Sequence, residues 1–120
     1  MRSAALLLAA AAALTSAAFA ASADGNYRIV GAGGVACSQI TADIAASQAA
    51  ADEVGSWLAG YATATNRQIA DTWDLMGASG LDAYYAAVQA DCVATPDKMF
   101  ETAAFDVLNA GYETRTVTTP

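Results

Sequence analysis

The chain contains two cysteines, Cys37 and Cys92, and its most regular amphipathic segment lies between them. Within residues 54–66 the apolar and small side chains recur every three or four positions, which is the spacing of one helix face. The residues on this face are Val54, Trp57, Leu58, Tyr61, Ala62 and Thr65. The pattern predicts a central helix that buries this face in a small core, covered by the segments that carry the two cysteines.

Residues 1–23 read as a secretory signal peptide. Arg2 supplies the positive charge, and residues 4–14 form an apolar run that is too short to span a bilayer. Two motifs of small residues predict cleavage after Ala20 or after Ala23. We therefore expect a periplasmic or secreted protein, with an N-terminal membrane anchor as the alternative. No later apolar run is long enough for a membrane span.

Two cysteines in an exported chain are most simply explained by one disulfide. The alternatives are two free thiols or a metal pair, but the chain has no histidine that could complete a zinc site with Cys37 and Cys92. A bridge between these positions would close a long loop and stabilise the fold by roughly 4 kcal/mol in the chain-entropy model.

The mature chain is strongly acidic. Loss of Arg2 with the signal peptide leaves four basic side chains against twelve acidic ones, a net charge of −8. Such a charge repels nucleic acid and anionic lipid, so we expect neither as a partner. The charge also predicts a response to acid, because carboxylates lose their charge near pH 4.

Residues 24–36 predict an extended arm followed by a flexible glycine-rich loop. Residues 31–36 formally match the G-x-G-x-x-G/A dinucleotide fingerprint, with Asp52 and Glu53 about twenty positions further on. That fingerprint requires a parallel sheet, and no second strand is indicated downstream. We therefore expect no nucleotide cofactor here.

Residues 38–47 predict a short helix with Ser38 or Thr41 as its N-cap. This helix either continues into the central helix or is separated from it by a kink near Ser47. Gly60 in the central helix predicts close approach of another backbone. Residues 68–80 predict a connection in which Trp73 packs onto the core as a lid, or else serves as an anchor for a partner.

Two further helices are predicted in the second half of the chain. Residues 81–95 present one apolar face, and Pro96 fits the first position of the next helix with Thr95 as its N-cap. The expected face of the first helix comprises Leu81, Tyr84, Tyr85, Val88 and Cys92, and that of the second comprises Met99 or Phe100, Ala103, Val107 and Leu108. Gly111 is the expected C-cap, and residues 112–120 are the expected flexible tail.

The predicted fold is thus all-α: a small domain over residues 37–111, with four antiparallel helices, one disulfide and an extended N-terminal arm. The chain has no histidine, and Lys98 is its only lysine, so we predict no catalytic residues and no enzyme activity. The carboxylate pairs Asp71 with Asp74 and Asp52 with Glu53 are interpreted as solvated charges. No metal ligands and no cofactor are predicted.

The chain resembles the HdeA/HdeB-like group of small exported helical proteins. The resemblance rests on the signal peptide, Cys37, the motif W-L-A-G-Y at residues 57–61, and C-V-A-T-P at residues 92–96 followed by Phe100. It implies a periplasmic helical domain with one disulfide, and in the best-known members a chaperone that loosens in acid and holds unfolded clients. Unlike those chaperones, this chain has only Arg115 as a basic residue after Leu108.

These observations together predict a non-enzymatic binding protein that holds unfolded clients under stress. The candidate binding or core face comprises Trp57, Leu58, Tyr61 and Trp73, and the fold or a weak homo-oligomer is expected to loosen below about pH 4. The alternative is an immunity-type inhibitor of one toxin or enzyme, since the Rap/Tai-like immunity proteins are similar in size and layout, or a protein of unassigned role.

Overall fold

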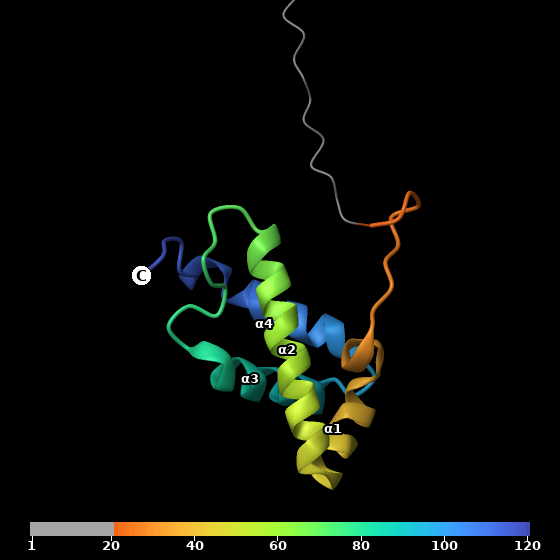
Figure 1. Cartoon of the computed structure of the whole chain (residues 1–120). Coiled ribbons are helices and arrows are strands. Elements are labelled where there is room, and N and C mark those ends of the chain that lie inside the picture. Colours follow the sequence, from red (N-terminus) through yellow and green to blue (C-terminus); the bar gives the residue numbers. More distant parts are fainter. Residues whose placement is uncertain (1–20) are drawn as a thin grey trace, which may run out of the picture.

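The computed structural model describes residues 21–120, and most of the predicted signal peptide, with its first cleavage motif, lies outside these residues. The elements in chain order are η1 (Gly31–Gly34), α1 (Cys37–Ala46), α2 (Gln48–Gln68), α3 (Gly80–Ala94), α4 (Phe100–Ala110) and η2 (Tyr112–Thr114). Two isolated bridges are the only β-type pairing within residues 21–120. The prediction of an all-α, four-helix domain with an extended N-terminal arm is confirmed (Figure 1).

The long helix α2 is the centre of the domain. α1 returns alongside its first half, whereas α3 and α4 pack on each other and cross α2 instead of running antiparallel to it (Figure 1). The prediction of four antiparallel helices is therefore wrong in its geometry. The predicted face of α2 is correct, because Val54, Leu58 and Ala62 are buried in the core.

The chain breaks between α1 and α2 at Ser47, so the segment forms two helices. Ser47 is extended, with φ −154° and ψ 130°, and its Oγ accepts a hydrogen bond from the backbone N–H of Ala50 at 3.4 Å. An N-cap of this kind satisfies one of the free N–H groups at a helix start. A serine in this conformation therefore ends one helix and begins the next.

The start of α1 differs from the prediction, because neither Ser38 nor Thr41 is its N-cap. The helix begins at Cys37, and its first N–H groups bind distant carbonyls: Cys37 N to Lys98 O at 2.8 Å, and Ser38 N to Pro96 O at 2.9 Å. Backbone groups from far along the chain thus replace the local side-chain cap.

The start of α4 differs for the same reason. The helix begins at Phe100, not at Pro96, because residues 95–98 form a turn in which Lys98 N binds Thr95 O at 3.0 Å. Phe100 N then binds Val35 O at 2.9 Å. The segment around residues 96–100 is held against residues 35–38, and this pairing prevents it from coiling earlier.

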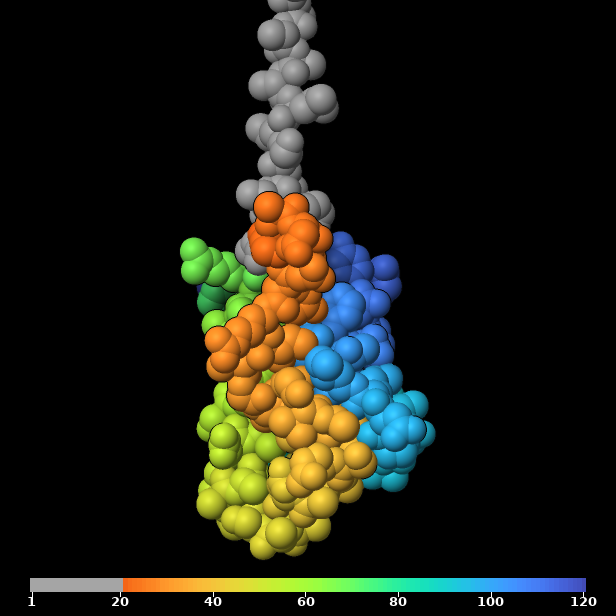
Figure 2. Space-filling view, turned by 90° about the vertical axis from the view of Figure 1, so that its right-hand side faces the viewer, coloured from red at the N-terminus to blue at the C-terminus, as the bar shows by residue number. Residues whose placement is uncertain are grey.

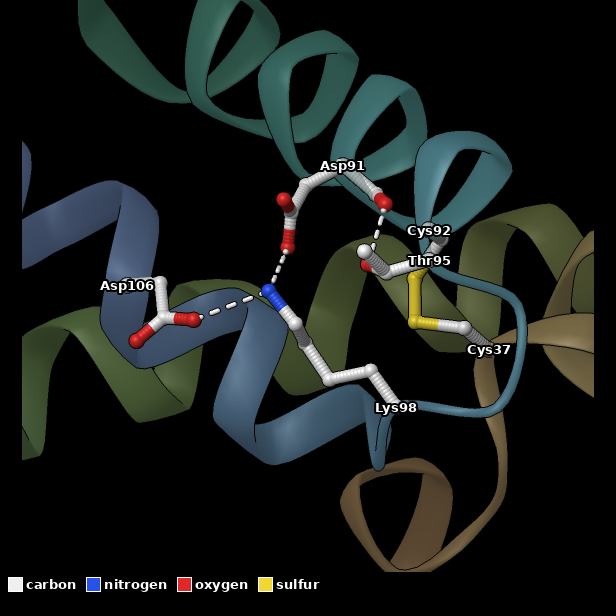
Figure 3. Close-up of polar contacts among 6 residues, drawn as sticks. All are labelled: Cys37, Asp91, Cys92, Thr95, Lys98 and Asp106. Atoms are coloured by element: carbon white, nitrogen blue, oxygen red, sulfur yellow. Dashed lines mark hydrogen bonds and ion pairs between the residues drawn. A yellow bond between two sulfur atoms is a disulfide. The ribbon is translucent and has the colours of Figure 1, made fainter.

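The predicted disulfide joins the N-terminus of α1 to the last turn of α3. Cys37 and Cys92 have an S–S distance of 2.05 Å and a Cα–Cα distance of 4.8 Å, and both are buried. Figure 3 shows the disulfide, which shares Cys37 with the backbone pairing just described. One covalent link and several hydrogen bonds therefore secure the same junction.

The remaining core comes from all four helices and from Leu75 in the connection after α2. Of the two alternatives for α4, Phe100 is buried and Met99 is exposed. Leu81 is also exposed, so its prediction as part of the buried face of α3 is wrong.

A Cβ placed on Gly60 would have no neighbour within 4 Å, so the predicted close backbone approach there is absent. Gly55 is the glycine of α2 that faces another helix, because its Cβ would lie 3.8 Å from the ring of Tyr85.

The C-terminal tail is more ordered than predicted. Gly111 caps α4 as expected, but the chain then forms η2 and pairs with the connection after α2. Asp74 N donates to Thr116 O at 3.1 Å, and Thr116 N donates to Asp74 O at 2.9 Å.

Arg115 adds side-chain contacts to this pairing. Its Nε donates to the hydroxyl of Thr72 at 3.2 Å, and its guanidinium stacks on the ring of Tyr112 at 3.8 Å. The tail therefore braces the connection between α2 and α3.

Candidate binding face beneath the N-terminal arm

An aromatic stack occupies the exposed side of α2 where it meets α4. Trp57 and Tyr61 are one helical turn apart, and their rings stack with centroids 5.0 Å apart and planes inclined by 15°. The ring centroid of Trp57 also lies 5.6 Å from that of the buried Phe100. The indole thus joins the core to the surface.

The N-terminal arm covers this stack. The indole Nε1 of Trp57 donates a 2.7 Å hydrogen bond to the carbonyl of Val30. Beneath the six-membered ring of the indole lies Gly33, where a Cβ would fall 2.1 Å from Cζ2, so only glycine fits. Figure 2 shows the arm lying across the surface where α2 and α4 meet. The expected flexible glycine loop is instead the short 3-10 helix η1. Gly33 is the second glycine of the dinucleotide fingerprint, which a bound pyrophosphate would approach, and the indole of Trp57 occupies that space.

A carboxylate ties the arm to the two helices. Glu101, in the first turn of α4, accepts hydrogen bonds from the hydroxyls of Tyr61 at 2.7 Å and Tyr27 at 3.3 Å. Burial, together with the bond to Glu101, raises the pKa of Tyr61. The negative charge of Glu101 raises the pKa of Tyr27. Both phenols therefore remain donors across the neutral range.

The four residues of the predicted face, Trp57, Leu58, Tyr61 and Trp73, do not form one surface. Trp57 and Tyr61 lie together under the arm, and Leu58 is fully buried in the core beneath them. Trp73 is 52% exposed, so the prediction of a lid over the core is wrong. Its backbone N–H is held by Thr116 O at 2.8 Å, and Val117, beside Thr116, is similarly exposed.

Sequence reasoning missed Tyr27, Val30 and Glu101 as parts of this site. The bonds that join them to α2 or to each other span 27 to 74 positions, and no local pattern indicates such a pairing. The spacing of Tyr27 and Ile29 two positions apart is the one signal that could have placed both residues on the same side of an extended arm.

Lys98 links α3 to α4 next to the disulfide. Its Nζ lies 2.8 Å from a carboxylate oxygen of Asp91 and 2.9 Å from one of Asp106 (Figure 3). The bond to Asp91, and then that to Asp106, raises the pKa of Lys98. These are the ion pairs found within residues 21–120, and their geometry serves to join two helices.

The carboxylate pair Asp71 and Asp74 shapes the connection after α2. Oδ1 of Asp74 accepts from the backbone N–H of Met76 at 3.0 Å and from the amide of Asn66 at 3.2 Å. Asp71 adopts a positive φ of 52°, a conformation that aspartate tolerates better than most residues. Among the residues that the structure describes, no group of three or more potential metal ligands comes together.

No family model matches the chain, and neither the curated proteins nor the solved structures with which it was compared match it. None of the helices within residues 21–120 combines the length and apolar character needed to cross a membrane.

Proposed function

We propose that the mature chain is a small, exported, non-enzymatic binding protein that holds unfolded clients under stress, as the HdeA/HdeB-type chaperones do. The observation that supports this best is the way the Trp57–Tyr61 stack is covered. The cover is the N-terminal arm and not a packed helix. Two hydrogen bonds hold it: Trp57 Nε1 donates to the carbonyl of Val30, and the hydroxyl of Tyr27 donates to Glu101. Displacing the arm exposes stacked aromatic surface, to which an unfolded chain binds, without unfolding the core.

Acid is the proposed trigger. As the carboxylates protonate near pH 4, the net side-chain charge of the mature domain moves from −8 towards +4. The repulsion among its own charges is smallest where the net charge passes through zero, and it rises again at lower pH. Near pH 2–3 the net charge is positive, so the remaining repulsion is between cations. The disulfide and the buried core hold the helices together, so the arm is the part expected to leave first.

The test is suppression of client aggregation. An acid-sensitive client is shifted to pH 2–3 with and without the mature protein, and light scattering follows its aggregation. We expect protection at pH 2–3 and little at pH 7, together with dye binding and a change in tryptophan fluorescence over the same pH range. A protein that keeps its size, binds no dye and leaves the client to aggregate contradicts the proposal.

A second function, inhibition of one specific toxin or enzyme, is favoured by Trp73. This side chain is half exposed on a connection that the C-terminal tail braces, and a rigid exposed tryptophan is a common anchor of specific interfaces. The mature protein and its Trp73→Ala variant serve as baits in periplasmic extract. One stoichiometric partner that the variant loses favours inhibition, whereas many weak clients retained by the variant favour chaperoning.

A further inference from the structure

We infer that the N-terminal arm is an internal stand-in for the client. The site beneath it then accepts an extended segment with an aromatic residue, a β-branched apolar residue two positions later, and a free backbone carbonyl one position after that. This inference rests on the proposed function, because it names the kind of chain segment that the Trp57–Tyr61 face holds.

The arm itself shows this pattern. In an extended chain, side chains two positions apart point to the same side. Ile29 is half-buried, and its Cγ2 lies only 2.8 Å from where a Cβ on Gly33 would lie. Tyr27 is 63% exposed and contacts the domain through its hydroxyl, which donates to Glu101 at 3.3 Å. Arg28 and Val30, which alternate with them, are exposed. The domain therefore contacts the apolar side chain of Ile29 and the hydroxyl of Tyr27, and makes no side-chain contact that buries Arg28 or Val30.

The contacts that hold the arm are ones that another chain can supply. The acceptor of the Trp57 Nε1 bond is a backbone carbonyl, which every peptide has. Glu101 accepts hydrogen bonds, so a hydroxyl or an amine from a client serves in place of Tyr27. Outside the helices, no backbone-to-backbone hydrogen bond joins residues 27–29 to the rest of the part of the domain that the structure describes.

Gly31 is the pivot of the arm. It adopts a positive φ of 74°, and a Cβ there would lie 3.1 Å from Cδ1 of Trp57. Residues 35 and 36, a few positions after it, are joined to α4 and α1 by backbone bonds, whereas no such bond holds residues 27–29. The arm can therefore swing away at Gly31 while the glycine platform under Trp57 stays in place.

The experiment releases the arm by one substitution and offers a peptide in its place. The full mature chain is prepared with Trp73→Phe, so that Trp57 is its only tryptophan. Ile29→Asp removes the inward apolar contact, and Val30→Asp is the matched control, since it adds the same charge on the outward side of the arm. The probe is the peptide GNYRIVG, blocked at both ends, titrated at pH 7 against Trp57 fluorescence, with GNYRDVG as the control peptide.

We expect Ile29→Asp to bind GNYRIVG at least about tenfold more tightly than the parent and Val30→Asp, because the arm no longer occupies the site. GNYRDVG is expected not to bind. Tyr27→Ala with Ile29→Ala, which introduces no charge, is a second variant with the same expected result, and unchanged far-ultraviolet circular dichroism verifies that both variants fold.

Equal affinity in all variants, or no binding to folded variants, overturns the inference. Concentration-dependent dimers of Ile29→Asp without peptide binding overturn it too, and assign the site to the arm of a second copy. Client protection without peptide binding defeats this inference alone, whereas peptide binding without client protection under acid defeats the proposed chaperone function and leaves the site intact.

Discussion

The indole Nε1 of Trp57 lies 2.7 Å from the carbonyl oxygen of Val30, a residue 27 positions earlier in the chain. This bond joins the half-buried Trp57–Tyr61 stack of α2 to the N-terminal arm, and the same indole covers Gly33 and contacts Phe100. Trp57 therefore reports on both the core and the arm.

Substitution of Gly33 by alanine should displace the indole of Trp57. The added Cβ would lie 2.1 Å from Cζ2 and 2.6 Å from Cη2, so the ring or the arm must move. We expect a loss of about 1–3 kcal/mol in the free energy of unfolding and a red shift of Trp57 emission. Gly60→Ala in α2 is the control, because its added Cβ would have no neighbour within 4 Å. It should stabilise the fold by about 0.5–1 kcal/mol, since alanine favours a helix over glycine. Equal effects of the two substitutions would refute this account of the packing.

Two phenylalanines in α4 offer a matched test of the core. Phe100 is fully buried, whereas Phe105, five positions further along the same helix and therefore on another face, is 44% exposed. Phe100→Ala should cost about 3–5 kcal/mol in urea unfolding through lost burial and the cavity that remains. Phe105→Ala should cost about 1 kcal/mol or less, since most of its surface is already hydrated. A similar loss from both would mean that α4 presents a different face to the core.

Removal of the disulfide should lower stability without changing the helices. The bond from Cys37 to Cys92 closes a loop of 55 positions, for which the chain-entropy model gives roughly 4 kcal/mol. Comparison of the oxidised protein with Cys37→Ala, Cys92→Ala by urea unfolding measures this difference. Thiol titration of the unfolded, unreduced protein should find no free thiol, and detection of two thiols would contradict the bond.

Alkaline pH should destabilise the fold through buried phenols. Burial raises the pKa of Tyr84, and the pKa of Tyr61 is raised in the same direction by burial and by its bond to Glu101. A group whose folded pKa is raised stabilises the fold fully below its unfolded pKa of about 10, and this contribution is lost as pH rises through the folded pKa.

Urea unfolding at pH 8, 10 and 11.5 tests this sign. The slope is at most about 1.4 kcal/mol per pH unit for each phenol, and smaller for Tyr61 because solvent screens its half-exposed ring. The raised pKa of Lys98 acts in the same direction. Tyr84→Phe removes the hydrogen bond to Ala104 O, so its free energy of unfolding should be about 1 kcal/mol lower at pH 8. Between pH 8 and 11.5 the stability of this variant should fall less steeply than that of the parent, because one buried phenol is gone. A urea midpoint that does not fall above pH 10 would contradict the burial of these phenols.

The sequence alone determined the helical class, the buried face of α2, the disulfide and the cap at Gly111. These features follow from local spacing and composition: apolar residues three and four positions apart share a helix face, and the two cysteines of a chain predicted to be exported are expected to pair with each other. Such information is carried within one helix or by the residue type itself, so no knowledge of the packing is needed to read it.

Only the tertiary structure decided where α1 and α4 begin, which tryptophan is covered and what covers it. Thr95 and Pro96 are a good local helix start, but α4 begins at Phe100 because residues 96–100 bond to residues 35–38 instead. Trp57 and Trp73 have the same tendency to be buried, yet only Trp57 meets an arm and a glycine of the right shape. Distant backbone bonds and steric fit set these outcomes, and both depend on segments that sequence spacing does not bring together.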